Sequence, residues 1–174
     1  MIVSSRLYFL KSMNPTIQQC VRGSCVEIES LQHCFFSCAG LTKMWRSLWQ
    51  PWRKAFAVDL EWRILLFPKL RVLDVGWSPQ HKVLLLLWRI HTAIVFHATW
   101  RLRNDILFKE TTADQPSVEN VTASFRRHCQ FIFHHPRELH TDDKAIASVV
   151  ERLGFAPLVP RTMPSESHIW IPQP

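Results

Sequence analysis

Four cysteines and a histidine crowd into residues 20–38, CVRGSCVEIESLQHCFFSC, of a chain with five cysteines in all. Thiolate sulfurs and imidazole nitrogens are the ligands of structural zinc sites, which are closed tetrahedra of four protein groups. The spacing Cys20-x4-Cys25-x7-His33-x4-Cys38 offers three thiolates and one imidazole for such a site. Because a closed site leaves no position for a reacting water, the spacing predicts a structural Zn²⁺ ion and no zinc catalysis.

Three interpretations of this stretch stay open: a metal site, a disulfide, and buried free thiols that act as small hydrophobes. The first residues, MIVSSRLYFLKSM, have no signal-peptide pattern, because Arg6 and Lys11 interrupt the apolar region and no small-residue cleavage site follows. We therefore expect an intracellular protein, nuclear or cytoplasmic and not secreted. There, clustered cysteines favour a metal. Cys34, beside His33 and before two phenylalanines, fits packing better than ligation.

The ligand candidates are embedded in a longer pattern. Glu29 and Ser30 precede His33, an apolar pair follows at Phe35 and Phe36, and Trp45 lies seven positions after Cys38. This pattern resembles the zinc-binding domain that follows the polymerase in the reverse transcriptases of non-LTR (LINE-like) retrotransposons. The chain departs from the family at the first cysteine pair, which has four intervening residues where the family more often has two.

A second motif lies downstream. Residues Trp100, Arg103, Asn104 and Phe108 form Trp-x-x-Arg-Asn-x-x-x-Phe, which is similar to a motif often found in such elements. The two matches cover roughly residues 17–108. The resemblance implies a noncatalytic C-terminal part of a reverse transcriptase, separated from its polymerase, with Zn²⁺ as cofactor. It implies template RNA or target DNA as partner, and a polymerase domain as a further one.

Hydrophobic periodicity predicts a mainly α protein, in which a small N-terminal zinc-binding loop docks on a helical body. A Trp-rich helix follows the cysteines, and Pro51 is expected to end or kink it after two to three turns. Its apolar face has steps of three and four residues, at Leu41, Met44, Trp45, Leu48, Trp49, Trp52 and Phe56.

The longest helix is expected from Ser78, an N-cap, through Pro79, its first residue, to Glu110. Residues 80–110 contain no Gly or Pro, which allows about 30 helical residues. The helix is apolar on more than one side, so we expect it to be central. Its broad stripe comprises Leu84, Leu87, Trp88, His91, Ile94, Val95, Ala98 and Leu102.

Two later helices complete the expected body. One is capped by Ser117 and stopped by Pro136, and the other is capped by Thr141 or Asp142 and stopped by Gly154. We thus expect four parts, which are a zinc-binding segment with the Trp-rich helix (1–57), a connector (58–77), the helical body (78–154) and a Pro-rich, poorly ordered tail (155–174).

The chain is basic, with a formal net charge of +7, which suits an anionic partner such as nucleic acid. Candidate phosphate-contacting residues are Arg22, Lys43, Arg46, Arg53, Lys54, Arg101 and Arg103. An ordinary solvated face is the alternative interpretation of these charges. Two alternatives to nucleic-acid binding also stay open: a helical interaction module that zinc stabilises, and a nonfunctional remnant of a retroelement.

Other chemistry finds little support in the sequence. The pair Asp142-Asp143 fits helix capping better than catalysis. His134, His135 and His140 lack nearby thiolates for a second metal site. No Gly-rich phosphate loop is present, and the longest apolar run, residues 83–88, is far short of the roughly 20 residues that span a bilayer. We therefore expect no enzyme activity, no small-molecule substrate and no membrane partner.

Overall fold

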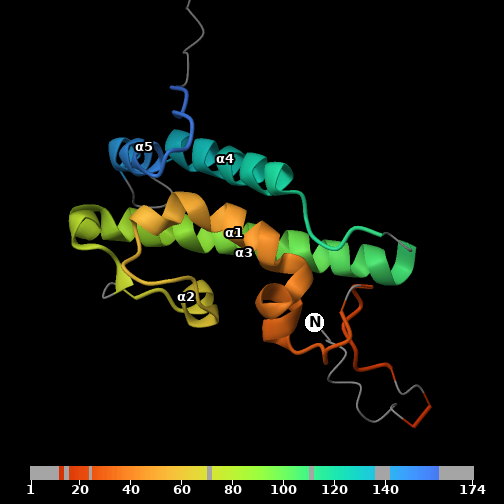
Figure 1. Ribbon diagram of the computed structural model, residues 1–174. Helices are drawn as coiled ribbons and strands as arrows, with labels where there is room; N and C mark the ends of the chain where they lie inside the picture. The colour runs from red at the N-terminus through yellow and green to blue at the C-terminus, as the bar shows by residue number, and fades with distance from the viewer. Residues whose placement is uncertain are drawn as a thin grey trace, which may run out of the picture.

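The computed structural model describes residues 12–13, 16–23, 25–69, 72–109, 112–135 and 142–160. Its α-helices are α1 (Thr42–Trp49), α2 (Trp62–Leu66), α3 (His81–Lys109), α4 (Val118–His134) and α5 (Asp143–Arg152) (Figure 1). Over these residues the β pairings are two isolated bridges, Gln19 with Ile28 and Phe56 with Leu73. The described chain is therefore mainly α, as predicted.

Helix α3 is the long central helix that the sequence predicts, and the other helices surround it (Figure 1). Its start differs from the expectation. Ser78 and Pro79 lie inside a 3₁₀ helix, Val75–Gln80, that leads into α3. The cap of this turn is Asp74, whose carboxylate accepts a hydrogen bond from Gly76 N at 2.9 Å. Pro79 is thus the fifth residue of the 3₁₀ helix and precedes α3 by two positions, so it is not the first residue of the long helix as expected.

Helix α1 ends two residues before Pro51, which the sequence predicts as the residue that ends or kinks it. After its eight residues the chain tightens into a 3₁₀ helix, Gln50–Lys54, with Pro51 in the first turn. The change of helix type still keeps the indoles on the inner side, where Trp45, Trp49 and Trp52 are buried. The Trp-rich segment therefore lies as one apolar ridge against α3 and α4.

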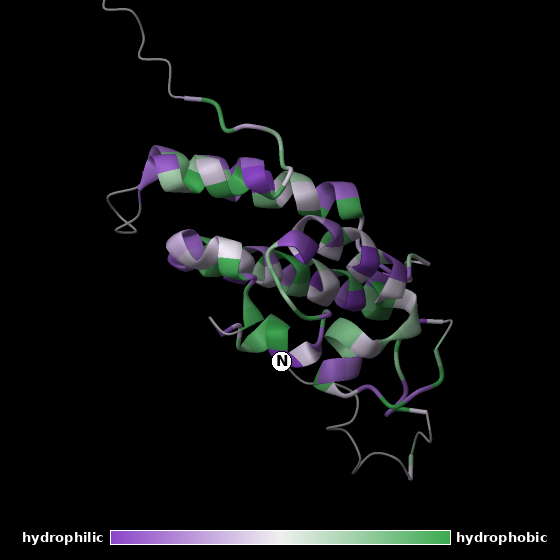
Figure 2. Cartoon of the chain, turned by 60° about the vertical axis from the view of Figure 1, so that its left-hand side comes forward, coloured by the Kyte–Doolittle hydropathy of each residue, from purple (hydrophilic) through white to green (hydrophobic). Residues whose placement is uncertain are grey.

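Helices α4 and α5 have the predicted caps. The Ser117 side chain accepts from Asn120 N at 3.2 Å, and the Asp142 side chain accepts from Lys144 N at 3.0 Å. Thr141 and Pro136 lie outside the described residues. Gly154 ends the last helical turn with φ +88°, a conformation that favours glycine. The helices carry hydrophobic and hydrophilic residues side by side, as amphipathic helices do (Figure 2).

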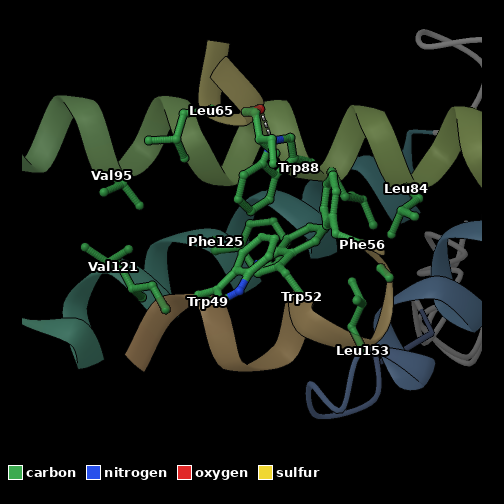
Figure 3. Packing of buried hydrophobic residues seen from close by; sticks show 14 of the residues in the cluster. Trp49, Trp52, Phe56, Leu65, Leu84, Trp88, Val95, Val121, Phe125 and Leu153 are labelled. Atoms are coloured by element: carbon green, nitrogen blue, oxygen red, sulfur yellow. Dashed lines mark hydrogen bonds between the residues drawn. The ribbon is translucent and has the colours of Figure 1, made fainter. Parts of the chain in front are cut away.

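The core is a cluster of aromatic rings between α3, α4 and the Trp-rich segment (Figure 3). Trp52 and Trp88 are fully buried, with ring centroids 4.9 Å apart at 70°. Trp52 also contacts Phe125 of α4, and Phe56 contacts Trp88. Edge-to-face ring pairs of this kind add about 0.5–1.5 kcal/mol each beyond their burial. The indole Nε1 of Trp88 donates to Ile64 O at 2.9 Å, which fixes α2 on the core.

The connector and the tail are partly built into the body. Within 58–77 the chain forms α2 and the bridge to Leu73, and the last 3₁₀ turn places Trp77 in the core. Residues 155–160, the start of the segment expected to be poorly ordered, lie against α4. Phe155 packs on Phe125, and Gln130 exchanges two hydrogen bonds with the Val159 backbone. Residues 161–174 are outside the described chain.

The 3₁₀ turn and α3 together, residues 75–109, are long and apolar enough to cross a membrane by length and composition. The short apolar run at residues 83–88, taken alone, did not predict an apolar segment of this length. In the structure this helix packs on α4, α5 and the metal-ligand region, so part of its apolar surface is buried inside the protein. A core helix passes the same test of length and composition as a membrane span.

Candidate metal centre

The first two candidate ligands lie on a loop that the backbone closes. Cys20 N donates to Glu27 O at 2.8 Å, and Glu29 N donates to Gln18 O at 2.9 Å, around the bridge of Gln19 with Ile28. Inside this loop Cys25 N donates to Arg22 O at 2.9 Å. This tight turn brings the thiols of Cys20 and Cys25 to one side.

The second pair of ligands lies on a wide helical turn. Ser30 Oγ accepts from His33 N at 3.0 Å and so caps the start of this turn. Residues His33–Ser37 then form a π-helix, and Cys38 N donates to His33 O at 3.2 Å. Regular α-helical spacing would place two residues five positions apart on different faces of the helix. The wider π turn, with its i to i+5 bond, brings them together instead.

The four candidate ligands converge. The sulfurs of Cys20, Cys25 and Cys38 and a ring nitrogen of His33 all lie within 4.8 Å of one another. Cys20 Sγ is 3.9 Å from Cys38 Sγ, and Cys25 Sγ is 3.3 Å from His33 Nε2. Ligands about 2.0–2.3 Å from a tetrahedral ion lie about 3.3–3.8 Å apart, so these residues could hold one metal ion. No other such group occurs among the described residues.

The thiols of Cys20 and Cys38 differ in pKa. Their mutual hydrogen bond lowers the pKa of Cys38 to about 7 and raises the pKa of Cys20 to about 12. Within this pair the thiolate of Cys38 is therefore accessible near neutral pH, and a metal ion must displace the proton of Cys20. Since ligands bind metal only when deprotonated, metal affinity should fall as the pH falls.

Residues around the ligands complete the site. Glu27 Oε2 lies 3.4 Å from His33 Nδ1, on the side of the ring away from the thiols. A carboxylate in that place orients a ligating imidazole. Arg22 is 1% exposed, and its Nη1 lies 3.8 Å from Cys20 Sγ. Neither role was found from the sequence, because a single acid or a single arginine in a loop has no distinctive spacing.

Arg22 also ties the loop to the rest of the protein. Its Nε donates to Asp114 O at 3.0 Å and its Nη2 donates to Cys34 O at 3.1 Å. Gly40 lies beside this side chain, since a Cβ there would make an ordinary van der Waals contact of 3.4 Å with Arg22 Cδ. Arg22 therefore joins the loop, the π turn and the segment between α3 and α4.

A buried ion pair forms the second tie. Glu29 and Arg103 are 0% and 6% exposed, and Arg103 donates to Glu29 Oε1 from Nε at 2.9 Å and from Nη2 at 2.6 Å. Glu29 belongs to the cysteine motif and Arg103 to the downstream motif. The two patterns that were recognised separately in the sequence thus meet in space.

These contacts correct the predicted phosphate-contacting surface. Arg22 and Arg103 are buried and donate within the protein, so neither is part of an exposed basic face. The other five candidates are exposed, and none forms an ion pair with a described residue; they are Lys43, Arg46, Arg53, Lys54 and Arg101. Four of them lie on the Trp-rich segment, and Arg101 lies on α3.

The remaining candidates pack as structural residues. Cys34 is fully buried outside the ligand group, and burial raises its thiol pKa to about 11, so it fits packing as expected. Trp45 is buried as well, and its Nε1 donates to Phe35 O at 2.8 Å, which fastens α1 to the π turn. His134 and His135 join no metal-ligand group of the described residues, and His140 lies outside them.

Comparison with known proteins adds no relative. No family model matches the chain, and no curated protein and no solved structure gives a significant match. The similarity to the retrotransposon zinc-binding domain therefore rests on the quoted residues alone. What the structure adds is the geometry of one group of three thiols and one imidazole.

Proposed function

We propose that the chain is a noncatalytic zinc-binding module that binds nucleic acid, as the retroelement resemblance implies. The convergence of Cys20, Cys25, His33 and Cys38 carries this proposal. Three thiolates and one imidazole are a characteristic donor set of structural zinc sites. All four positions are filled by the protein, so the ion would stabilise the fold and would not activate water.

The nucleic-acid part rests on a basic strip, defined as Lys43, Arg46, Arg53 and Lys54. Residues 30–58 contain no Asp or Glu, so these cations have no acidic neighbour in the sequence. The buried indoles occupy the inner side of the segment, which leaves the strip exposed. Exposed, unpaired cations can replace the counterions of a phosphate backbone.

The metal ligands and the basic strip are adjacent parts of one structure. Cys38 precedes the short 3₁₀ turn, Ala39–Leu41, that runs directly into α1. Gln115, from the segment before α4, accepts from Met44 N at 3.0 Å and so caps the start of α1. An ion at the site would therefore fix the N-terminal end of the strip relative to α3 and α4.

Filter binding of a mixed-sequence RNA and of the matching DNA, at about 50 and about 200 mM salt, tests the proposal. We expect binding that weakens with salt. Changing the four strip residues to Gln should weaken binding and flatten its salt dependence. A control with the same charge change uses four exposed cations elsewhere, namely Lys82, Arg126, Arg127 and Lys144. Absence of binding even at about 50 mM salt would overturn the nucleic-acid role.

A second candidate function is docking on a protein such as a polymerase domain. It is favoured by a cavity of about 610 Å³ beside α2, lined in part by Val58, Ile64, Phe67 and Val72. Phe67, at the edge of this cavity, is 71% exposed and could contact a docked protein. Binding of no nucleic acid at low salt would leave this function as the better account.

A further inference from the structure

The C-terminal half of α3 has an exposed face that the core does not use. Trp100 is 39% exposed and Phe108 is 80% exposed, and His97 and Asn104 share their side of the helix at steps of three and four residues. This end of α3 extends past α1 and α4 (Figure 1). We call these four residues the aromatic face.

Packing does not account for the two aromatic residues. The inner side of the same turns is occupied by Thr99 and by Arg103, which reaches Glu29. Trp100 contacts the His97 ring, with centroids 6.0 Å apart at 36°, and Phe108 has no ring contact with a described residue. Of the motif Trp-x-x-Arg-Asn-x-x-x-Phe, the arginine therefore serves the fold while both aromatic residues point outward.

The charges beside the aromatic face suit an anionic chain. Arg101 is exposed and forms no ion pair with a described residue. The neighbouring acid, Asp105, is paired with Lys109 at 2.8 Å. Exposed aromatic rings beside cations are the usual platform for single-stranded nucleic acid, because the rings stack on bases and the cations meet the phosphates.

We propose that the aromatic face binds unpaired bases of a single-stranded nucleic acid. This inference rests on the proposed function and adds its substrate class. Trp100 and Phe108 each stack on a base, and at 1.5 Å per residue they lie about 12 Å apart along α3, far enough to hold two different bases. Arg101 meets the phosphate backbone, and the Asn104 amide lies between the rings, where it can hydrogen-bond a base edge.

Fluorescence anisotropy with a labelled RNA of about 16 nucleotides tests the proposal on the full chain. Three probes share one backbone, namely the single strand, its duplex, and the single strand with abasic sites at its centre. We expect the wild type to prefer the intact single strand to both other probes. The double variant Trp100→Ala, Phe108→Ala should bind the single strand at least about thirtyfold more weakly than the wild type does, and should bind the abasic strand nearly as well as the wild type does.

Phe131→Ala is the matched control, because Phe131 is an exposed aromatic residue on α4, 56% exposed and outside this face. It should leave all affinities unchanged, and far-UV circular dichroism should show all variants folded. Equal binding of the double variant and the wild type would overturn the inference, as would equal binding of intact and abasic strands. In both cases nucleic-acid binding itself would stand, whereas a wild type that binds no probe would overturn both proposals.

Discussion

At the scale of single residues, Glu29 and Arg103 form a buried ion pair that joins the metal-ligand region to α3 across 74 positions of sequence. Arg103 donates twice to one carboxylate oxygen, and both side chains are buried. In such a place the attraction between the charges is strong, but each charge without the other would be stranded away from water. The pair therefore makes the position of the metal loop on α3 specific.

Removing one partner of this pair should be costly. We expect Arg103→Met or Glu29→Leu to lower the free energy of unfolding by about 3–5 kcal/mol, because the remaining charge is buried and unpaired. The double variant should lose less than the sum of the two single variants. Urea unfolding measures all three, with Asp105→Asn in the exposed pair with Lys109 as a control that costs about 0.5 kcal/mol or less. A fully stable Arg103→Met protein would contradict this account.

His91 is the second residue with a predictable effect. Its ring lies among Trp52, Trp88 and Phe125, and its Nδ1 has no hydrogen-bond partner among the described residues. Burial lowers its pKa from 6.5 to about 3, so it is neutral in the folded protein. The unfolded chain takes up a proton near pH 6.5, which the folded chain takes up only near pH 3. Stability from this residue is therefore full above about pH 6.5 and declines between those values.

The difference in His91 pKa between the folded and unfolded chain should appear as a pH dependence of the free energy of unfolding. Between about pH 6 and 4 the free energy of unfolding should fall by about 1.4 kcal/mol per pH unit on account of His91. His91→Phe should remove that part of the slope, while His128→Gln, an exposed residue on α4, should leave it. Urea unfolding at a series of pH values separates the two. Equal slopes for wild type and His91→Phe would show that His91 does not contribute.

At the scale of elements, the way α5 ends depends on the backbone conformation of Gly154. Gly154 N donates to Glu151 O and Phe155 N donates to Val150 O, the pattern of a Schellman motif. The positive φ of Gly154 turns the chain so that Phe155 reaches the rings of Trp52 and Phe125. The cap therefore also places a core residue.

Gly154→Ala should lower the free energy of unfolding by about 1 kcal/mol, since alanine is strained at this φ. Gly23→Ala is the comparison, because a Cβ there meets nothing within 4 Å and no positive φ is involved. Thermal unfolding followed by circular dichroism measures both. A loss as large for Gly23→Ala as for Gly154→Ala would contradict the role of the left-handed conformation.

The elements also show which parts of the structure the sequence could predict. Capping residues and proline positions are local signals, so the ends of α1, α4 and α5 follow from Pro51, Ser117, Asp142 and Gly154. The spacing of thiols and imidazole likewise predicted the ligand group. The π turn at His33–Ser37 was not predictable, because it depends on bringing His33 to Cys38 and not on local preference.

Contacts between residues far apart in the sequence account for the other differences between the predictions and the structure. Arg22 and Arg103 looked like surface cations because arginine is usually exposed. Their burial depends on acceptors 92 and 74 positions away, Asp114 O and Glu29. Only the fold brings such partners together. The same holds for residues 155–160, which have a tail-like composition but find Gln130 and Phe125 on α4.

At the scale of the whole molecule, two centres stabilise the described chain. One is the aromatic core around Trp52 and Trp88, and the other is the ligand group that holds the N-terminal loop. They are joined by Trp45, whose indole bonds to the π turn, and by the ties of Arg22 and Arg103 to the α3 region. We expect a metal ion in the second centre, because Val26 and Ile28 of the loop are exposed and do not pack in the core.

The metal content of the purified protein tests this expectation most directly. The wild type should contain one equivalent of zinc, because its three thiolates and one imidazole form a closed tetrahedral set. Cys38→Ser should lose the ion, and Cys34→Ser should keep it because Cys34 lies outside the ligand group. Elemental analysis of the folded proteins gives the answer. A wild type that is fully folded and contains no metal would contradict the central claim.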